Sequence, residues 1–199
     1  MNKPLYIISD NCWGLGVYQS INSKYLSPFV NLYIHPTDYI KLLYNLDDYL
    51  NCKFTEVNFE DSNHFKLHNI PITQSPIIAK LNDIEVIFYH TKNKSSDEIF
   101  GDFYRRKQRL PENKDEIIIS FANDIYRYPE HERFNDYRSY SKINEILEKF
   151  YKLPYGKKVS FTSKKYNFPK NYVIHKNHSE NNLHLGLNHR YYIKDIFSF

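Results

Sequence analysis

Short apolar runs alternate with helical patterns along this chain. The runs predict strands at residues 5–9, 29–34, 54–59 and 116–121. The run at 116–121 is continuously apolar, which is typical of a strand buried on both faces. Apolar residues at helical spacing predict a helix over 37–51, with Thr37 as its N-cap. A capping box at 95–98 and a cap at Ser141 predict two further helices.

The remaining segments complete an α/β pattern. Residues 77–81 and 84–89 flank Asn82-Asp83, a pair that predicts a β-hairpin. Late strands are predicted at 159–162 and 172–174, a short helix or irregular crossing within 17–26, and a loop over 175–190. Strands interleaved with helices predict one α/β domain over residues 1–199, with a mixed, mostly parallel sheet flanked by helices in a Rossmann-like arrangement. No internal repeat or low-complexity linker divides it.

Composition narrows the class of protein. The net charge of +4 is mild: it suits an anionic small ligand and is not a nucleic-acid signature. Two cysteines in 199 residues do not make a disulfide scaffold, so we expect both to be reduced and the protein to be cytoplasmic. The sequence has no apolar segment of membrane-spanning length.

The densest candidate chemistry follows the first predicted strand, in the turn Ser9-Asp10-Asn11-Cys12-Trp13-Gly14. Ligands of open α/β sheets bind outside the carboxyl ends of strands, so this turn is a candidate active site. Cys12 is either a nucleophile or a small residue that fills space. Asn11, or the N–H groups of Trp13 and Gly14, could stabilise an oxyanion. Asp10 orients a base or caps the turn.

Other candidates lie at predicted strand ends and on one helix. His90 ends a strand and is either a general base or an ordinary hydrogen-bonded histidine. Asp124 follows the strand at 116–121 and could bind a metal, orient His90 or cap a turn. Arg105 and Arg106 suit phosphate binding, although a solvated helix face is the simpler interpretation for at least one of them. Histidines 175, 178, 184 and 189 match no zinc spacing, so no metal site is predicted.

Several of these segments together resemble one bacterial family. The matching segments are residues 7–14, 27–30, 36–41, 88–90, 105–106, 121–124, 153–155 and 158–162. In this order they resemble the domain of unknown function nineteen-nineteen, whose members are often labelled exopolysaccharide biosynthesis proteins. The family more often has Gly-Gly after the tryptophan, where this chain has Gly14-Leu15. The resemblance implies an association with surface-polysaccharide gene clusters and supplies no established reaction.

We therefore expect a transferase of surface polysaccharide (capsule, exopolysaccharide or lipopolysaccharide) biosynthesis. The favoured reaction is acyl transfer to a sugar hydroxyl, with acyl-coenzyme A as donor substrate and no tightly bound cofactor. One alternative is a glycosyl- or phosphoglycosyl-type transferase, in which the turn at 9–14 binds the phosphates of a nucleotide sugar. Another is a non-catalytic glycan-binding component whose tyrosines stack on sugar rings. The expected partners are a glycan or its precursor and a phosphate-containing donor; peripheral association with a membrane is left open.

Overall fold

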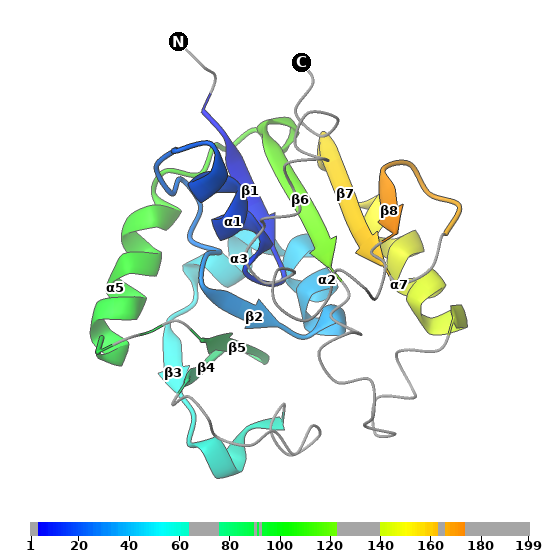
Figure 1. Ribbon diagram of the computed structural model, residues 1–199. Helices are drawn as coiled ribbons and strands as arrows, with labels where there is room; N and C mark the ends of the chain where they lie inside the picture. Colours follow the sequence, from blue (N-terminus) through cyan, green and yellow to red (C-terminus); the bar gives the residue numbers. More distant parts are fainter. Residues whose placement is uncertain are drawn as a thin grey trace.

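The strands form two sheets in the part of the chain that the structure describes. The computed structural model describes residues 4–63, 76–89, 91, 93–122, 140–162 and 166–173 (Figure 1). One sheet is four-stranded and parallel, in the order β1-β6-β7-β8, and the other is four-stranded and antiparallel, in the order β2-β5-β4-β3. The protein is thus a mixed α/β protein.

The parallel sheet is buried on both faces. Its strands are β1 (Tyr6–Ser9), β6 (Ile117–Ala122), β7 (Lys157–Thr162) and β8 (Asn171–Val173). Along β6, Ile119 belongs to the main hydrophobic cluster and Ile118 to a second cluster on the opposite face. The prediction that this strand is buried on both faces is confirmed.

Helices cover both faces of this sheet. Helix α1 (Trp13–Ser20) packs through Trp13 and Val17 against the cluster that contains Ile118. Helices α2 (Pro36–Tyr44) and α7 (Tyr140–Lys152) pack on the other face, where Leu43 and Leu147 are completely buried. The segment after β1 is helical from residue 13, earlier than the crossing expected within 17–26.

The antiparallel sheet is the main departure from expectation. Its strands are β2 (Leu32–Ile34), β3 (Phe54–Glu56), β4 (Ile77–Leu81) and β5 (Ile84–Phe88). The hairpin at Asn82 is confirmed, and this residue has φ of +58°, which asparagine tolerates. Because a two-residue turn joins antiparallel strands only, β4 and β5 start an antiparallel sheet, to which β2 and β3 add. One mostly parallel, Rossmann-like sheet is therefore not confirmed.

The helical predictions hold in part. The predicted helix over 37–51 is two helices, α2 and α3 (Leu46–Asn51), separated at Asn45. The N-cap of α2 is His35 and not Thr37, because Pro36 already occupies the first turn. Helix α5 (Ser96–Lys107) begins with the predicted capping box between Ser95 and Glu98. The described residues also include two short 3₁₀ helices, η1 (Phe59–Asp61) and η2 (Lys114–Glu116).

Candidate functional site

The turn between β1 and α1 is closed by its own side chains. The Ser9 hydroxyl donates to the backbone oxygen of Asn11 at 2.7 Å and accepts from the Gly14 N–H at 3.2 Å. The Asn11 side-chain oxygen accepts from the Trp13 N–H at 2.9 Å. These bonds satisfy backbone donors at the start of α1, as N-terminal caps do. The two N–H groups considered for an oxyanion hole are thus already engaged within the turn.

Asp10 joins strands of the two sheets. Its side chain is 1% exposed, and its carboxylate oxygens accept from the Ala122 N–H at 3.0 and 3.2 Å. The backbone oxygen of Asp10 accepts from the Ile34 N–H at 2.8 Å. Asn11 Nδ2 donates to the backbone oxygen of Ala122 at 3.4 Å. Asp10 therefore connects the carboxyl ends of β1 and β6 with β2, which is a structural role.

Cys12 is the reactive side chain of this turn. It is partly buried and occupies the N-cap position of α1, where its side chain forms no capping hydrogen bond. Helix N-termini stabilise negative charge, so the position suits an anionic group. The predicted base His90 and the predicted carboxylate Asp124 lie outside the described residues, as do the histidines of the tail. Within the described ranges, no group of three or more His, Cys, Asp or Glu side chains could hold a metal ion.

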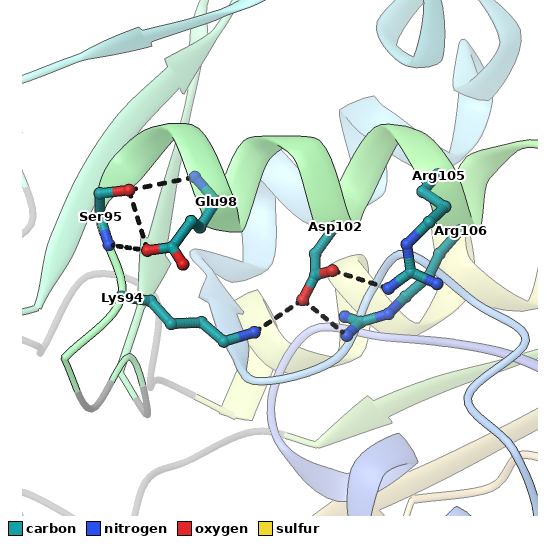
Figure 2. Close-up of polar contacts among 6 residues, drawn as sticks. All are labelled: Lys94, Ser95, Glu98, Asp102, Arg105 and Arg106. Carbon is teal, nitrogen blue, oxygen red and sulfur yellow. Dashed lines mark hydrogen bonds and ion pairs between the residues drawn. The ribbon is translucent and has the colours of Figure 1, made fainter.

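A second group of charged residues lies on α5 and immediately before it (Figure 2). Asp102 accepts from Lys94 at 2.8 Å, from Arg105 at 2.7 Å and from Arg106 at 3.2 Å. The hydrogen bonds from Lys94 and Arg105 lower the pKa of Asp102 to about 2. The carboxylate is therefore ionised at neutral pH and holds three cationic side chains together.

Arg106 is the most enclosed of these cations. Its side chain is 15% exposed, and its guanidinium carbon lies 5.7 Å from the centroid of the Tyr25 ring. Burial lowers the pKa of Arg106, yet guanidinium groups in proteins remain protonated. Contact with the Tyr25 ring and the hydrogen bond to Asp102 together fix the orientation of the guanidinium group.

An open groove of about 430 Å³ lies beside Arg106. One wall is formed by the end of α1 and the segment that follows it. The other is formed by the C-terminal part of α5 and the turn after it, which carries Arg109. The cationic residues of the groove are Lys24, Arg105, Arg106 and Arg109, and none of the described residues that line it is acidic. Arg109 Nη1 donates to the backbone oxygen of Tyr25 at 2.9 Å and so joins the two walls. Even with Asp102 included, these side chains carry a net charge of +3, which favours anions.

A smaller cavity of about 70 Å³ adjoins Arg106 as well. It lies between α5 and the segment that leads into β2, and Arg106 lines both the cavity and the groove. No residue of the turn at 9–14 lines either of these two hollows. The groove adjoins the C-terminal end of α1, whereas Cys12 caps its N-terminal end, and eight helical residues extend roughly 12 Å. The structure does not bring the predicted arginines together with Cys12.

Sequence reasoning identified two of the four groove cations. Arg105 and Arg106 were predicted, and Asp102 three and four residues before them was a readable signal for ion pairs. Lys24 and Arg109 were missed, because their proximity depends on packing between segments more than 80 residues apart in sequence, such as Arg109 and Tyr25.

The fold and these hollows define a mixed α/β protein with a basic groove beside α5. Among the described helices, none combines the length and apolar character needed to cross a membrane. The chain belongs to the family described as Domain of unknown function (DUF1919), which matches residues 1–193. It is also similar to a Haemophilus influenzae protein described as an uncharacterized protein, with 26% identity over 167 residues. The match covers 83% of this chain and 65% of the relative's length.

Proposed function

We propose that the protein is a transferase of bacterial surface-polysaccharide biosynthesis whose donor substrate carries phosphate. The observation that carries this proposal is the groove bordered by Lys24, Arg105, Arg106 and Arg109, in which no carboxylate of the described part of the chain lines the wall. Guanidinium forks bind phosphate oxygens in a bidentate manner, and lysine adds a point charge. The link to surface polysaccharide comes from the label that the family often carries.

The position of the groove favours a donor whose reacting atom adjoins its phosphates. In a nucleotide sugar, an acceptor oxygen bonds to the anomeric carbon while the bond from that carbon to the phosphate oxygen breaks. The acceptor's proton passes to a base, and the departing diphosphate gains negative charge. Fixed cations such as Arg106 would stabilise that charge without reorganising. In phosphoglycosyl transfer, the acceptor oxygen bonds instead to the phosphorus attached to the sugar, the P–O bond to the nucleoside monophosphate breaks, and the same cations would stabilise this leaving group. Glycosyl or phosphoglycosyl transfer is therefore the reaction that the groove supports best.

Acyl transfer through Cys12 is the second candidate, because Cys12 is partly exposed at the start of a helix. If the groove held the phosphates of acyl-coenzyme A, its thioester would have to reach along α1, roughly 12 Å. The long pantetheine arm of coenzyme A permits this reach, whereas a nucleotide sugar has no such arm. The two donors can thus be distinguished, because acyl transfer from acyl-coenzyme A requires Cys12, whereas transfer from a nucleotide sugar does not.

Binding measurements test the phosphate-bearing donor. Isothermal titration calorimetry with pyrophosphate, uridine diphosphate and coenzyme A should detect binding to the intact protein. The double variant Arg105→Gln/Arg109→Gln and the single variant Lys24→Gln should each weaken it, the double variant by about tenfold or more. Lys80→Gln is the matched control, because Lys80 is an exposed lysine of β4 that does not line the groove. Absence of binding to all three ligands, or unchanged affinity in the groove variants, would contradict the proposal.

Mass spectrometry of the intact protein tests the acyl route. After incubation with acetyl-coenzyme A, an acetyl adduct that Cys12→Ala abolishes and Cys52→Ala retains would favour covalent acyl transfer. Cys52 is the suitable control because it is also a partly buried cysteine. No adduct, together with tight binding of uridine diphosphate, would leave glycosyl or phosphoglycosyl transfer as the supported reaction.

A further inference from the structure

The cavity next to Arg106 has both apolar and polar walls. Val30, Phe88 and Phe103 are buried core residues that form part of its lining. Its volume of about 70 Å³ accommodates several water-sized groups. A wall of this kind suits a ligand that presents C–H groups on one side and polar atoms on the other.

Asn31, one of the residues that line this cavity, carries an unsatisfied acceptor. Its side-chain oxygen is buried and has no hydrogen-bond partner among the described residues. The backbone holds the residue in place, because φ is +61° and the Asn31 oxygen accepts from the Tyr89 N–H at 3.2 Å. Buried acceptors without a partner are rare in folded proteins, so this oxygen points to a missing donor.

The remaining polar lining includes both donors and acceptors. Thr91 offers a hydroxyl, and Lys94 and Arg106 offer cationic N–H groups. Asp102 also lines the cavity, although its carboxylate already accepts from Lys94, Arg105 and Arg106. Hydroxyl groups both donate and accept, so a polyhydroxylated ligand matches this mixture better than a purely anionic one.

We propose that this cavity receives hydroxyl groups of a sugar whose attached phosphate occupies the neighbouring groove. This inference rests on the proposed function and adds the substrate class, a sugar phosphate or the sugar-phosphate part of a larger donor. A sugar hydroxyl donates to the Asn31 side-chain oxygen, and the C–H groups of the ring face Phe88 and Phe103. Arg106, which lines both hollows, contacts the phosphate and the sugar together.

Calorimetry with matched ligands tests this assignment. The probes are inorganic phosphate and the 1-phosphates of glucose, galactose and N-acetylglucosamine. The wild type should bind at least one sugar phosphate about tenfold or more tightly than phosphate, since the sugar adds hydrogen bonds and apolar contacts. Asn31→Gly removes the side-chain oxygen and keeps a residue that tolerates positive φ. It should lower that ratio, because one of the sugar's hydrogen bonds is lost, without changing the affinity for inorganic phosphate.

Asn93→Gly is the matched control, because Asn93 also has positive φ, is exposed and does not line the cavity. It should leave the ratio unchanged. Phosphate binding with no additional affinity for any sugar phosphate, or a ratio that Asn31→Gly does not change, would overturn the sugar assignment alone. Failure of the wild type to bind any of the four probes, together with pyrophosphate and uridine diphosphate, would overturn the proposed function and this inference with it.

Discussion

The guanidinium group of Arg106 lies above the ring of Tyr25, with 5.7 Å between its central carbon and the ring centroid. Asp102 accepts from the same group at 3.2 Å. A cation that is positioned by a ring and a carboxylate has little rotational freedom left to lose when it binds a ligand. Tyr25 and Asp102 therefore hold the guanidinium group of Arg106 in place beside both the groove and the cavity.

Replacing Arg106 with lysine should weaken the binding of uridine diphosphate by about tenfold or more, although the charge is kept. Lysine lacks the planar fork that stacks on Tyr25 and reaches Asp102 at the same time. Calorimetry measures the change. Arg105→Lys is the control: Arg105 is exposed, so the loss should be smaller. Equal effects of the two variants would contradict the special position of Arg106.

Asp102→Asn should reduce stability by an amount that depends on pH. The pKa of Asp102 is about 2 in the folded protein, below its ordinary value of 3.8. A lowered pKa contributes stability that is fully present above pH 4 and is lost as the pH falls through about 2. The wild type should exceed the variant by about 1 kcal/mol or less at pH 6, because Asp102 is 23% exposed and solvent screens its ion pairs.

Urea denaturation of both proteins at a series of pH values measures this difference. The gap between wild type and Asp102→Asn should close between pH 4 and pH 2. Asp97→Asn provides a comparison on the same helix, since Asp97 is exposed and appears in none of the ion pairs of the described residues. A gap that widens toward low pH would show that Asp102 does not stabilise the fold as an anion.

Local patterns were sufficient for most individual elements. The apolar run of β6, the hairpin at Asn82 and the capping box at Ser95 depend on neighbours in sequence, and each lies where it was predicted. The separation into two sheets could not be predicted in this way. It depends on β2 pairing with β5, which are about 50 residues apart, so hydrophobic periodicity carries no information about it.

The candidate site was likewise predictable only where it depends on residues that are neighbours in sequence. The sequence pointed to the turn at 9–14 because polar residues follow a strand, and the structure uses several of them to close that turn. Capping and ligand binding require similar residue types, so composition alone does not separate them. Only two of the four groove cations, Arg105 and Arg106, could be predicted, because Lys24 and Arg109 come together through tertiary packing. The Asn31 oxygen gave no signal, because its isolation depends on burial.

Gly14→Ala should destabilise the protein by about 1–3 kcal/mol, through overpacking. A Cβ atom at this position would lie 2.9 Å from Ser9 Oγ and 3.2 Å from Ile7 Cγ2. The Ser9 hydroxyl has little room to move, because it also bonds to the backbone of Asn11. Thermal or urea denaturation measures the loss.

Gly101→Ala is the matched control for that prediction. Gly101 lies inside α5, and an added Cβ would meet nothing within 4 Å. Alanine is the better helix former, so this variant should gain about 0.5–1 kcal/mol. If Gly14→Ala and Gly101→Ala had the same free energy of unfolding, the close packing of α1 on β1 would not explain the glycine at position 14.

Tyr18→Phe should cost about 1–3 kcal/mol, because it leaves one buried and one partly buried backbone group without their partner. The Tyr18 hydroxyl donates to the Leu5 oxygen at 2.8 Å and accepts from the Ile7 N–H at 3.1 Å, so it fastens α1 to β1. Tyr44→Phe is the control: Tyr44 is 48% exposed, and its loss should be within about 0.5 kcal/mol.

Alkaline pH gives the Tyr18 prediction a second readout. Burial raises the pKa of Tyr18 from 10.0 to about 12. A raised pKa contributes stability that is fully present below pH 10 and is lost as the pH rises through about 12. The stability advantage of wild type over Tyr18→Phe, measured by urea denaturation, should therefore be constant up to pH 10 and shrink above it. A constant advantage up to pH 12 would mean that the hydroxyl titrates alike in the folded and unfolded chains, and that burial does not raise its pKa.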